Sequence, residues 1–388
     1  MIESMTKATS NGTVKVRPVL SQHDQKVFLD VPHTLYGKNS NWVAPLYFER
    51  HEHLNPKKNP YFDHADAQLF VAEKDGKAVG RISAQIDKLH LERYKDATGQ
   101  FGFLEATDDA QVFAALFETA EKWLKSRNIK RVRGPFSFSI NDEMGLLIDG
   151  FDTPPNMLMG HALPYYQKQI EARGFTKAKD VIAYFLDNHD PLPRSMAAAY
   201  DRAMKSPHIE VRPLDKKNLA RDLDDILSIH TDAWSDNWGF VPFTAKELKV
   251  LGDNLKILVS REYIAIARYK GVPAAFAVTL PNINDWITGL DGKLLPFGWA
   301  KVMWNLFARP PKSVRMPLMG VRREFHGTLT GSSLALAVIE TVRRYHISRG
   351  TRNGELSWIL EDNMPMRHIL EALGARPYKT YRIYEKSL

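Results

Sequence analysis

Residues 319–350 read MGVRREFHGTLTGSSLALAVIETVRRYHISRG, a basic turn containing glycine that leads directly into a long segment of regularly spaced apolar side chains. The glycine at position 350 is placed to end a helix. We expect Ser332 and Ser333 to cap its first turn. The apolar side chains recur at helical spacing and predict one buried face, made of Leu334, Ala337, Val338, Thr341, Val342 and Tyr345.

The turn before this helix has the charge of an anion-binding site. Arg322, Arg323 and His326 precede the helix, and backbone N–H groups at a helix N-terminus attract phosphate. The turn therefore predicts a site for a phosphate or diphosphate group. A capped surface helix that follows an ordinary turn explains the same residues equally well.

The bulk composition describes an ordinary globular protein. Its 388 residues exceed the size of one average core and favour two domains. Hydrophobic residues make up 44% and charged residues 25%, and the absence of cysteine excludes disulfides and thiolate metal sites. The N-terminus has no apolar signal segment, and no run of ~20 apolar residues could span a membrane, so we expect a cytoplasmic protein.

The net charge of +8 favours polyanionic partners. Phosphorylated cofactors and anionic lipid headgroups fit this charge. Nucleic acid is the weaker expectation, because the basic residues are interspersed with acidic ones and no nucleic-acid recognition motif is present.

Short sequences recur at nearly constant spacing along the chain. Val-Arg-Pro begins at Val16 and again at Val211, an offset of 211 − 16 = 195 residues. A glycine that ends a short helix pattern stands at Gly174 and again at Gly374, an offset of 374 − 174 = 200. Matches at nearly one offset indicate an internal duplication.

Each half also predicts the same order of elements. A strand pair surrounds a hairpin turn at 75–76 and at 270–271, and a helix, a strand, a short helix and a last strand follow in both halves. We therefore predict two copies of one α/β domain, in residues 1–190 and 191–388.

The two copies differ in front of their long helix. Residues 105–109 read Glu-Ala-Thr-Asp-Asp, and these acidic side chains suit the N-terminus of the helix expected over 109–127 but repel phosphate. The corresponding segment of the second half is the basic turn. We therefore expect the second half to be the one that holds a phosphorylated cofactor.

Six short motifs are spread along nearly the whole chain: NWVAPL at 41–46, RISAQID at 81–87, RGP at 133–135, NWGFVP at 237–242, PLMGV at 317–321 and SWILEDNMPM at 357–366. They resemble those of tandem GNAT-like bacterial proteins, which carry two domains of the GNAT acetyltransferase superfamily. The resemblance implies an α/β fold, also classed as α+β, in which each domain is a mixed, mainly antiparallel twisted sheet flanked by helices. A further resemblance is to the bacterial ceramide synthases, which join a fatty acyl group to a sphingoid amine.

The resemblance implies an acyl-CoA donor in the second half. In the GNAT fold the turn amides hold the pyrophosphate of CoA, and the strand before them, here 314–321, splays from its neighbour to face the thioester carbonyl. Leu329 replaces a small residue and should narrow the approach of the diphosphate, and Leu370 stands where a tyrosine commonly protonates the leaving thiolate. The positions matched to the cofactor site are Met319, Gly320, Val321, Arg322, Arg323, Gly327, Thr328, Thr330, Gly331, Ser332 and Asn363.

Amide formation from a thioester needs a base for the amine and a donor for the developing oxyanion. His230, Asp236 and Glu361 are candidate bases, and each also fits a helix cap or a surface group. Tyr381 is a candidate acid, although its alternation with basic residues fits a half-buried strand equally well. The residues expected to contact the acceptor are Trp234, Asn237 and Trp238.

Residues 281–317 form an insertion relative to a minimal GNAT domain. Pro296 begins a predicted short helix whose apolar residues, including Trp299 and Phe307, share one face beside lysine and arginine. One expectation is peripheral contact with the inner face of a membrane through Trp299 and Phe307. The other is an arm that packs against the opposite domain.

The remaining expectations concern metals and the reaction. His51 and His53 lack a third ligand at a metal-binding spacing, so no metal site is expected and the segment is interpreted as a solvated loop. The sequence favours an N-acyltransferase that moves an acyl group from acyl-CoA to an amine, with a lipid-like sphingoid amine as the candidate acceptor. The alternative is a catalytically inactive GNAT-like protein that binds acyl-CoA or lipid.

Overall fold

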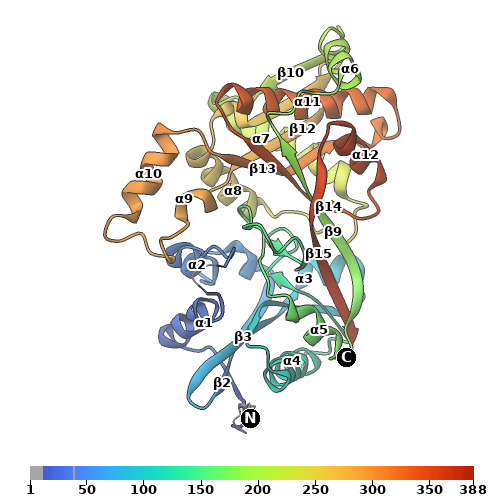
Figure 1. Cartoon of the computed structure of the whole chain (residues 1–388). Helices are drawn as coiled ribbons and strands as arrows, with labels where there is room; N and C mark the ends of the chain where they lie inside the picture. Colours follow the sequence, from blue (N-terminus) through green and yellow to red (C-terminus); the bar gives the residue numbers. More distant parts are fainter. Residues whose placement is uncertain (1–11, 38–39) are drawn as a thin grey trace, which may run out of the picture.

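The computed structural model describes residues 12–37 and 40–388 (Figure 1). The elements of the first half are β1 (Lys15–Pro18), α1 (Gln22–Leu35), α2 (Tyr47–His53), β2 (Ala65–Lys74), β3 (Lys77–Asp87), α3 (Lys88–Tyr94), β4 (Thr98–Ala106), α4 (Ala110–Lys125), β5 (Arg131–Gly134), β6 (Phe136–Ser137), β7 (Glu143–Met144), β8 (Leu146–Asp149), α5 (Tyr165–Glu171) and β9 (Thr176–Asp187).

The second half repeats most of this order, lacks counterparts of β6, β7 and β8 among its described residues, and adds an insertion. Its elements are α6 (Arg194–Met204), β10 (Ile209–Pro213), α7 (Leu219–Trp234), α8 (Ala245–Leu258), β11 (Ile264–Tyr269), β12 (Val272–Pro281), α9 (Asn284–Ile287), α10 (Gly298–Ala308), β13 (Ser313–Val321), α11 (Leu329–Ser348), β14 (Asn353–Leu360), α12 (Met364–Ala372) and β15 (Arg376–Ser387). Short 3-10 helices lie at Pro60–Asp63, Lys216–Asn218, Arg261–Tyr263 and Arg323–Phe325.

Thirteen of the described strands form one mixed sheet whose order is symmetric about its centre. The order is β1-β2-β3-β4-β5-β15-β9-β14-β13-β12-β11-β10, with β8 beside β15. The pairs β4–β5 and β13–β14 are parallel, and they occupy corresponding places in the two halves. The α/β fold class is confirmed, and the symmetric order agrees with the repeats in the sequence.

The last strand of each half pairs across the centre of the sheet. Strand β9 pairs with β14 of the second half, and β15 pairs with β5 of the first half as well as with β9 (Figure 1). The division into residues 1–190 and 191–388 therefore remains a proposal about the repeats. Separating the halves would expose unpaired strand edges, so the pairing between the halves stabilises the joined sheet.

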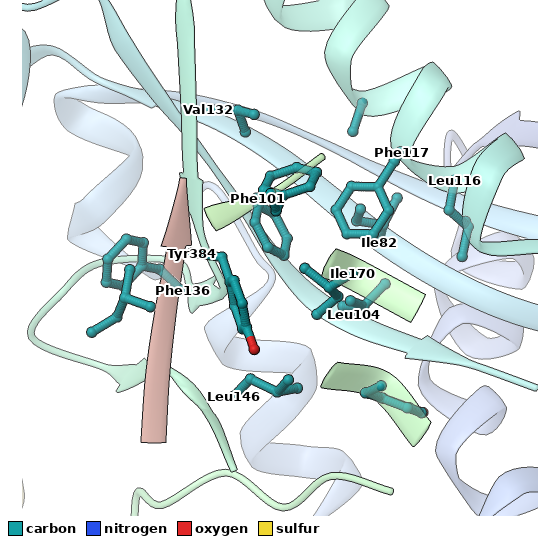
Figure 2. Packing of buried hydrophobic residues seen from close by; sticks show 14 of the residues in the cluster. Ile82, Phe101, Leu104, Leu116, Phe117, Val132, Phe136, Leu146, Ile170 and Tyr384 are labelled. Atoms are coloured by element: carbon teal, nitrogen blue, oxygen red, sulfur yellow. The ribbon is translucent and has the colours of Figure 1, made fainter. Parts of the chain in front are cut away.

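The core of the first half contains side chains from both ends of the chain. Helix α4 packs on the sheet through Val112, Phe113, Leu116 and Phe117, the face expected from helical spacing. Tyr384 of β15 is fully buried in the same cluster, and Figure 2 shows it beside residues of the first half. Full burial of each large side chain contributes roughly 1.5–3 kcal/mol, so β15 stabilises a core distant in sequence.

Helix α11 differs from the expectation in its cap and its burial. Thr328 caps it by accepting the Gly331 amide, so Ser332 and Ser333 lie inside the helix. A Cβ on Gly331 would lie 2.1 Å from the carbonyl oxygen of Phe325, which explains the glycine. Apolar residues off the expected face are buried as well, because α6 and the sheet both pack on α11.

Both parallel pairs open toward one end, as the resemblance implies. Pairing of β13 with β14 covers Ser313–Met316, whereas β13 continues beside β12 to Val321. Pairing of β4 with β5 likewise covers only Thr98–Gln100. Each opening leaves the second part of a central strand without its parallel neighbour.

The insertion contacts the first half through its loop. The amide of Tyr47 donates to the carbonyl of Gly292 at 2.9 Å, which fixes the loop before α10 against the start of α2. The expected solvated loop at His51 and His53 is instead the helix α2, since His53 Nε2 lies 2.9 Å from the Ser137 carbonyl and His51 Nδ1 lies 3.0 Å from the Gln25 side chain.

Candidate functional site

The opening of the second half is lined by α7. The indole N–H of Trp234 donates to the carbonyl of Met319 at 2.9 Å, in the part of β13 that has left β14. Gly320 follows with its Cα opposite Phe276 of β12, and Val321 ends the strand, where its carbonyl lies 2.7 Å from His326 Nε2. The sequence-predicted acyl site is therefore a strand edge whose carbonyls already have partners.

Acidic side chains partly neutralise the basic turn. Arg323 places its Nη1 2.8 Å from the Asp236 carboxylate, and its backbone amide donates to Asp232 at 2.8 Å. Arg322 donates to Ser228 at 2.8 Å. An open cavity of about 630 Å³ is lined by Arg322, Arg323, Asp232 and Ser228. Two guanidinium groups at this cavity fit a diphosphate, although the ligand would compete with the two carboxylates.

The other predicted turn residues lie at the start of α11. Gly327 has a φ of +72°, a conformation that favours glycine, and Thr328 follows as the cap. Thr330 and Ser332 occupy the first helical turn, and the side chain of Leu329 is 89% exposed. The cap of the next helix, α12, is Asn363, which accepts the Met366 amide at 3.2 Å.

The candidate bases differ in their surroundings. His230 is buried against the rings of Trp234, Phe240 and Phe243, and neither of its ring nitrogens has a hydrogen-bond partner within the described residues. This burial lowers the pKa of His230 to about 4, so the imidazole is neutral at physiological pH. Asp236 is largely exposed in its ion pair with the turn.

The remaining candidates lie in other contacts. Glu361 accepts the Asp180 amide at 3.1 Å and pairs with Lys177 at 2.6 Å. Tyr381 is fully buried between strands, and burial raises its pKa well above the ordinary value. Trp238 lies beneath the guanidinium of Arg133 at 4.9 Å, and Asn237 bonds through its backbone to the end of α7. The structure brings together Trp234, Met319, His230, Arg323 and Asp236.

A larger cavity, which sequence reasoning missed, lies in the first half. Its volume is about 1630 Å³, and it is bounded by α1, α2, β2 and the loop of the insertion at 288–293. A second cavity of about 140 Å³ lies deeper. His33, Trp42 and Tyr47 line both cavities, and their rings stack or meet edge to face. We call these the outer and inner cavities.

Four charged side chains line the inner cavity. Arg50 of α2 pairs with Glu143 of β7, and Arg81 of β3 faces Glu105 of β4 with 3.9 Å between Nη2 and Oε1. All four lie mostly out of solvent. Such groups are costly to bury unless they are paired or used, so this cluster marks a candidate functional site.

Glu105 has the most perturbed environment of these carboxylates. Burial raises its pKa to about 7, against the opposing effects of Arg81 and of two tyrosine hydroxyls. Tyr36 and Tyr166 donate to its Oε2 at 3.0 and 2.7 Å. His161 lies nearby, and burial lowers the pKa of its imidazole to about 4. A carboxyl that titrates near neutrality can exchange a proton with a ligand.

Strand register relates this carboxyl to the predicted acyl site. In the first half, Arg81 of β3 lies opposite Glu105 of β4. At the equivalent place in the second half, Phe276 of β12 lies opposite Gly320 of β13. The first half thus carries a buried charge pair at the position equivalent to the second-half strand edge. The arginine that begins the motif RISAQID was the one signal in the sequence.

Comparison with known proteins places the chain among bacterial relatives, although no protein-family model matches it. Protein YghO of Escherichia coli (strain K12) is 45% identical over 374 residues, which cover 96% of this chain and 95% of that protein. The bacterial ceramide synthase of Caulobacter vibrioides (strain NA1000 / CB15N) is 42% identical over 381 residues, 98% of this chain and 99% of that protein. This chain belongs to their family.

Solved structures share its fold at low sequence identity. A tandem GNAT protein from the clavulanic acid biosynthesis pathway aligns with a TM-score of 0.55 and 14% identity, over 96% of this chain and 98% of that chain. A GCN5-related N-acetyltransferase from Sphaerobacter thermophilus aligns with a TM-score of 0.50 and 12% identity, over 82% and 80%. The tandem GNAT fold inferred from the motifs is confirmed.

No helix in residues 12–37 and 40–388 has the length and apolar character needed to cross a membrane. Within the same ranges, no three histidine, aspartate or glutamate side chains are grouped so that they could hold a metal ion.

Proposed function

We propose that this protein is an N-acyltransferase that moves an acyl group from acyl-CoA to the amine of a long-chain, sphingoid-like acceptor. The observation that carries the proposal is the open end of β13 beside a basic helix-capping turn, in a chain that is 42% identical to a protein named bacterial ceramide synthase. The turn supplies the charge for the CoA diphosphate, and the strand edge supplies backbone groups for the thioester.

The reaction forms one amide bond and breaks one thioester. The uncharged amine nitrogen attacks the thioester carbon, the carbon–sulfur bond breaks, the CoA thiolate leaves, and the nitrogen loses a proton to a base. In the proposed arrangement Arg322 and Arg323 bind the diphosphate and Met319 lies beside the thioester. When the thioester binds, the indole N–H of Trp234 must then either break its hydrogen bond to the Met319 carbonyl or keep it beside the substrate.

We further propose that α10 and its flanks contact a lipid bilayer. Leu295, Phe297, Trp299, Trp304 and Phe307 are each at least half exposed, between 53% and 78%. Such a surface is unusual unless it meets a partner or a membrane. The flanking Lys301, Arg309 and Lys312 suit an anionic bilayer.

Flotation with vesicles tests this contact. The Trp299→Glu, Phe307→Glu double variant is expected to stay at the bottom of the gradient when wild type floats with anionic liposomes. The Val250→Glu, Val272→Glu double variant introduces the same two charges at exposed apolar sites away from α10 and should float like wild type. Equal flotation of the double variant contradicts the membrane contact.

The second candidate function is binding of acyl-CoA or lipid without turnover. Two observations favour it: Leu370 is buried in the core where a GNAT tyrosine would stand, and the carboxylates of Asp232 and Asp236 already engage Arg323. In this case the turn retains affinity for CoA but the protein releases none.

Two measurements on the purified protein separate the candidates. Calorimetry with CoA and with palmitoyl-CoA reports binding, and a thiol reagent reports release of CoA when sphinganine is added to palmitoyl-CoA. Amine-dependent release together with N-palmitoyl product by mass spectrometry supports the acyltransferase. Binding without release supports the second function, and an absence of binding contradicts both.

A further inference from the structure

The outer and inner cavities of the first half have no role in the function proposed above. We propose that they bind a long-chain amino alcohol, with its amine at Glu105, its hydroxyl groups at Arg81 and His161, and its chain in the outer cavity. The inference rests on the proposed function for the chemical class of this ligand. Because β4 lies five strand positions from β13 in the sheet, the site is separate from the thioester site and is a second binding site for that class.

Unused hydrogen-bonding atoms face the inner cavity. Within the described residues, the Nε of Arg81 and the Nδ1 of His161 are buried without a hydrogen-bond partner, and both side chains line the cavity. Buried polar nitrogen atoms seldom lack partners, so the cavity is suited to a ligand that carries oxygen atoms. Arg81 Nε can only donate, whereas the neutral imidazole can donate or accept.

The carboxyl of Glu105 has one oxygen available for a ligand. Oε2 accepts both tyrosine hydroxyls, from Tyr36 and Tyr166, whereas among the described residues Oε1 has only the guanidinium of Arg81 at 3.9 Å. That separation is too long for a hydrogen bond. An ammonium group could therefore approach Oε1 more closely than Arg81 does.

The charges around Glu105 favour an amine over a carboxylate. Arg50 is already matched by Glu143 and Glu49, so it has little remaining charge to offer an anionic headgroup. A carboxylate bound beside Glu105 would face a second negative charge or force that group to remain protonated. An ammonium ion would instead stabilise the ionised carboxylate and lower its pKa.

The outer cavity has the volume for a chain, and its wall combines apolar with polar side chains. Its volume of about 1630 Å³ exceeds the ~300–1,000 Å³ of ordinary small-molecule sites. Leu54 and Phe138 are buried apolar parts of its wall, and Lys26 and Lys293 are exposed charged parts that mark its opening. Lys293 lies in the loop that precedes α10, so the opening is near the surface proposed to meet the bilayer.

The experiment measures binding of a twelve-carbon 2-amino-1,3-diol to the full chain by calorimetry. The same diol without the amine, and dodecanoate, serve as matched probes. Wild type is expected to bind the amino diol at least about tenfold more tightly than either probe, because a charge-assisted contact is lost in both. Equal binding of the three probes overturns the proposal.

Two variants locate the site. Glu105→Gln is expected to bind the amino diol about tenfold more weakly while its affinity for CoA is unchanged, and Glu118→Gln, an exposed change on α4, should match wild type. Val43→Trp fills the wall shared by the two cavities and should abolish binding of the chain, with Val272→Trp at an exposed hairpin as its control.

The outcomes separate this inference from the proposed function. Binding of the amino diol in the cavities without release of CoA leaves the site intact and contradicts the acyltransferase. An unchanged affinity of folded Val43→Trp for the amino diol overturns the site and leaves the acyltransferase intact. If Glu105→Gln does not fold, Val43→Trp and the three wild-type probes still decide the question.

Discussion

The Nε2 of His64 lies 3.2 Å from the Oε1 of Glu247, so the start of β2 in the first half is joined to α8 of the second. The other ring nitrogen lies 3.0 Å from Asp87. Burial disfavours the imidazolium, but these two carboxylates outweigh it and raise the pKa of His64 to about 9. The charged histidine therefore links the two halves.

Replacing His64 with alanine should destabilise the protein in a pH-dependent way. A histidine whose folded pKa exceeds its unfolded value contributes stability that is complete below about 6.5 and is lost as the pH rises through about 9. We expect a loss of about 1–3 kcal/mol at pH 6 and a much smaller loss at pH 10, measured by urea unfolding. Lys246→Ala removes a neighbouring exposed ion pair with Asp63 and should change stability little. Equal losses at both pH values would contradict the link.

Glu105→Gln should stabilise the fold at alkaline pH. Because burial raises the folded pKa of Glu105 from 4.5 to about 7, ionising it costs stability that is absent at acid pH and complete above about pH 7. The glutamine variant should exceed wild type by up to roughly 3 kcal/mol at pH 8 and by less than about 1 kcal/mol at pH 5. Thermal unfolding at the two pH values checks this, and a variant that is less stable at pH 8 shows that the carboxylate is needed for packing.

Trp234→Phe should strengthen binding of acyl-CoA. The variant keeps the ring beside His230 but removes the N–H that occupies the Met319 carbonyl. If the pantetheine arm uses this strand edge, a hydrogen bond no longer has to be broken first. That bond is worth about 0.5–1.5 kcal/mol, so the dissociation constant should fall between about twofold and tenfold by calorimetry. An unchanged affinity would place the thioester elsewhere.

Asp236→Asn should also increase affinity for CoA. The Asp236 carboxylate lies 2.8 Å from Arg323, and both side chains are substantially exposed, so the pair is worth no more than about 1 kcal/mol. Its removal should lower the dissociation constant of CoA by up to about fivefold, with a stronger dependence on salt. Asp253→Asn, which removes another exposed charge, on α8, is the control. The opposite change, Arg323→Gln, should weaken binding.

Local chemistry made several features predictable. The hairpins at Asp75-Gly76 and Lys270-Gly271 form because these residues accept positive φ, and all four adopt it. The apolar face of α4 and the helix α10 follow from spacing alone. The predicted cap of α11, Ser332, is wrong, because serine and threonine are both good caps and the sequence offers Thr328 as well. Close packing of Gly331 on Phe325 selects Thr328.

The sequence by itself determined the order of elements in each half, the duplication, the basic turn and the family motifs, because these depend on neighbours in the chain. Only the tertiary structure decided where β15 pairs and which charges meet in the inner cavity. Glu105 receives its partners from Tyr36, Arg81 and Tyr166 on three separate elements, 69, 24 and 61 residues away in the chain (|105 − 36|, |105 − 81| and |105 − 166|). No local pattern encodes such contacts. They arise when helices and loops pack over the sheet around the cavity, and the same packing removes the water that would otherwise keep Glu105 an ordinary carboxylate.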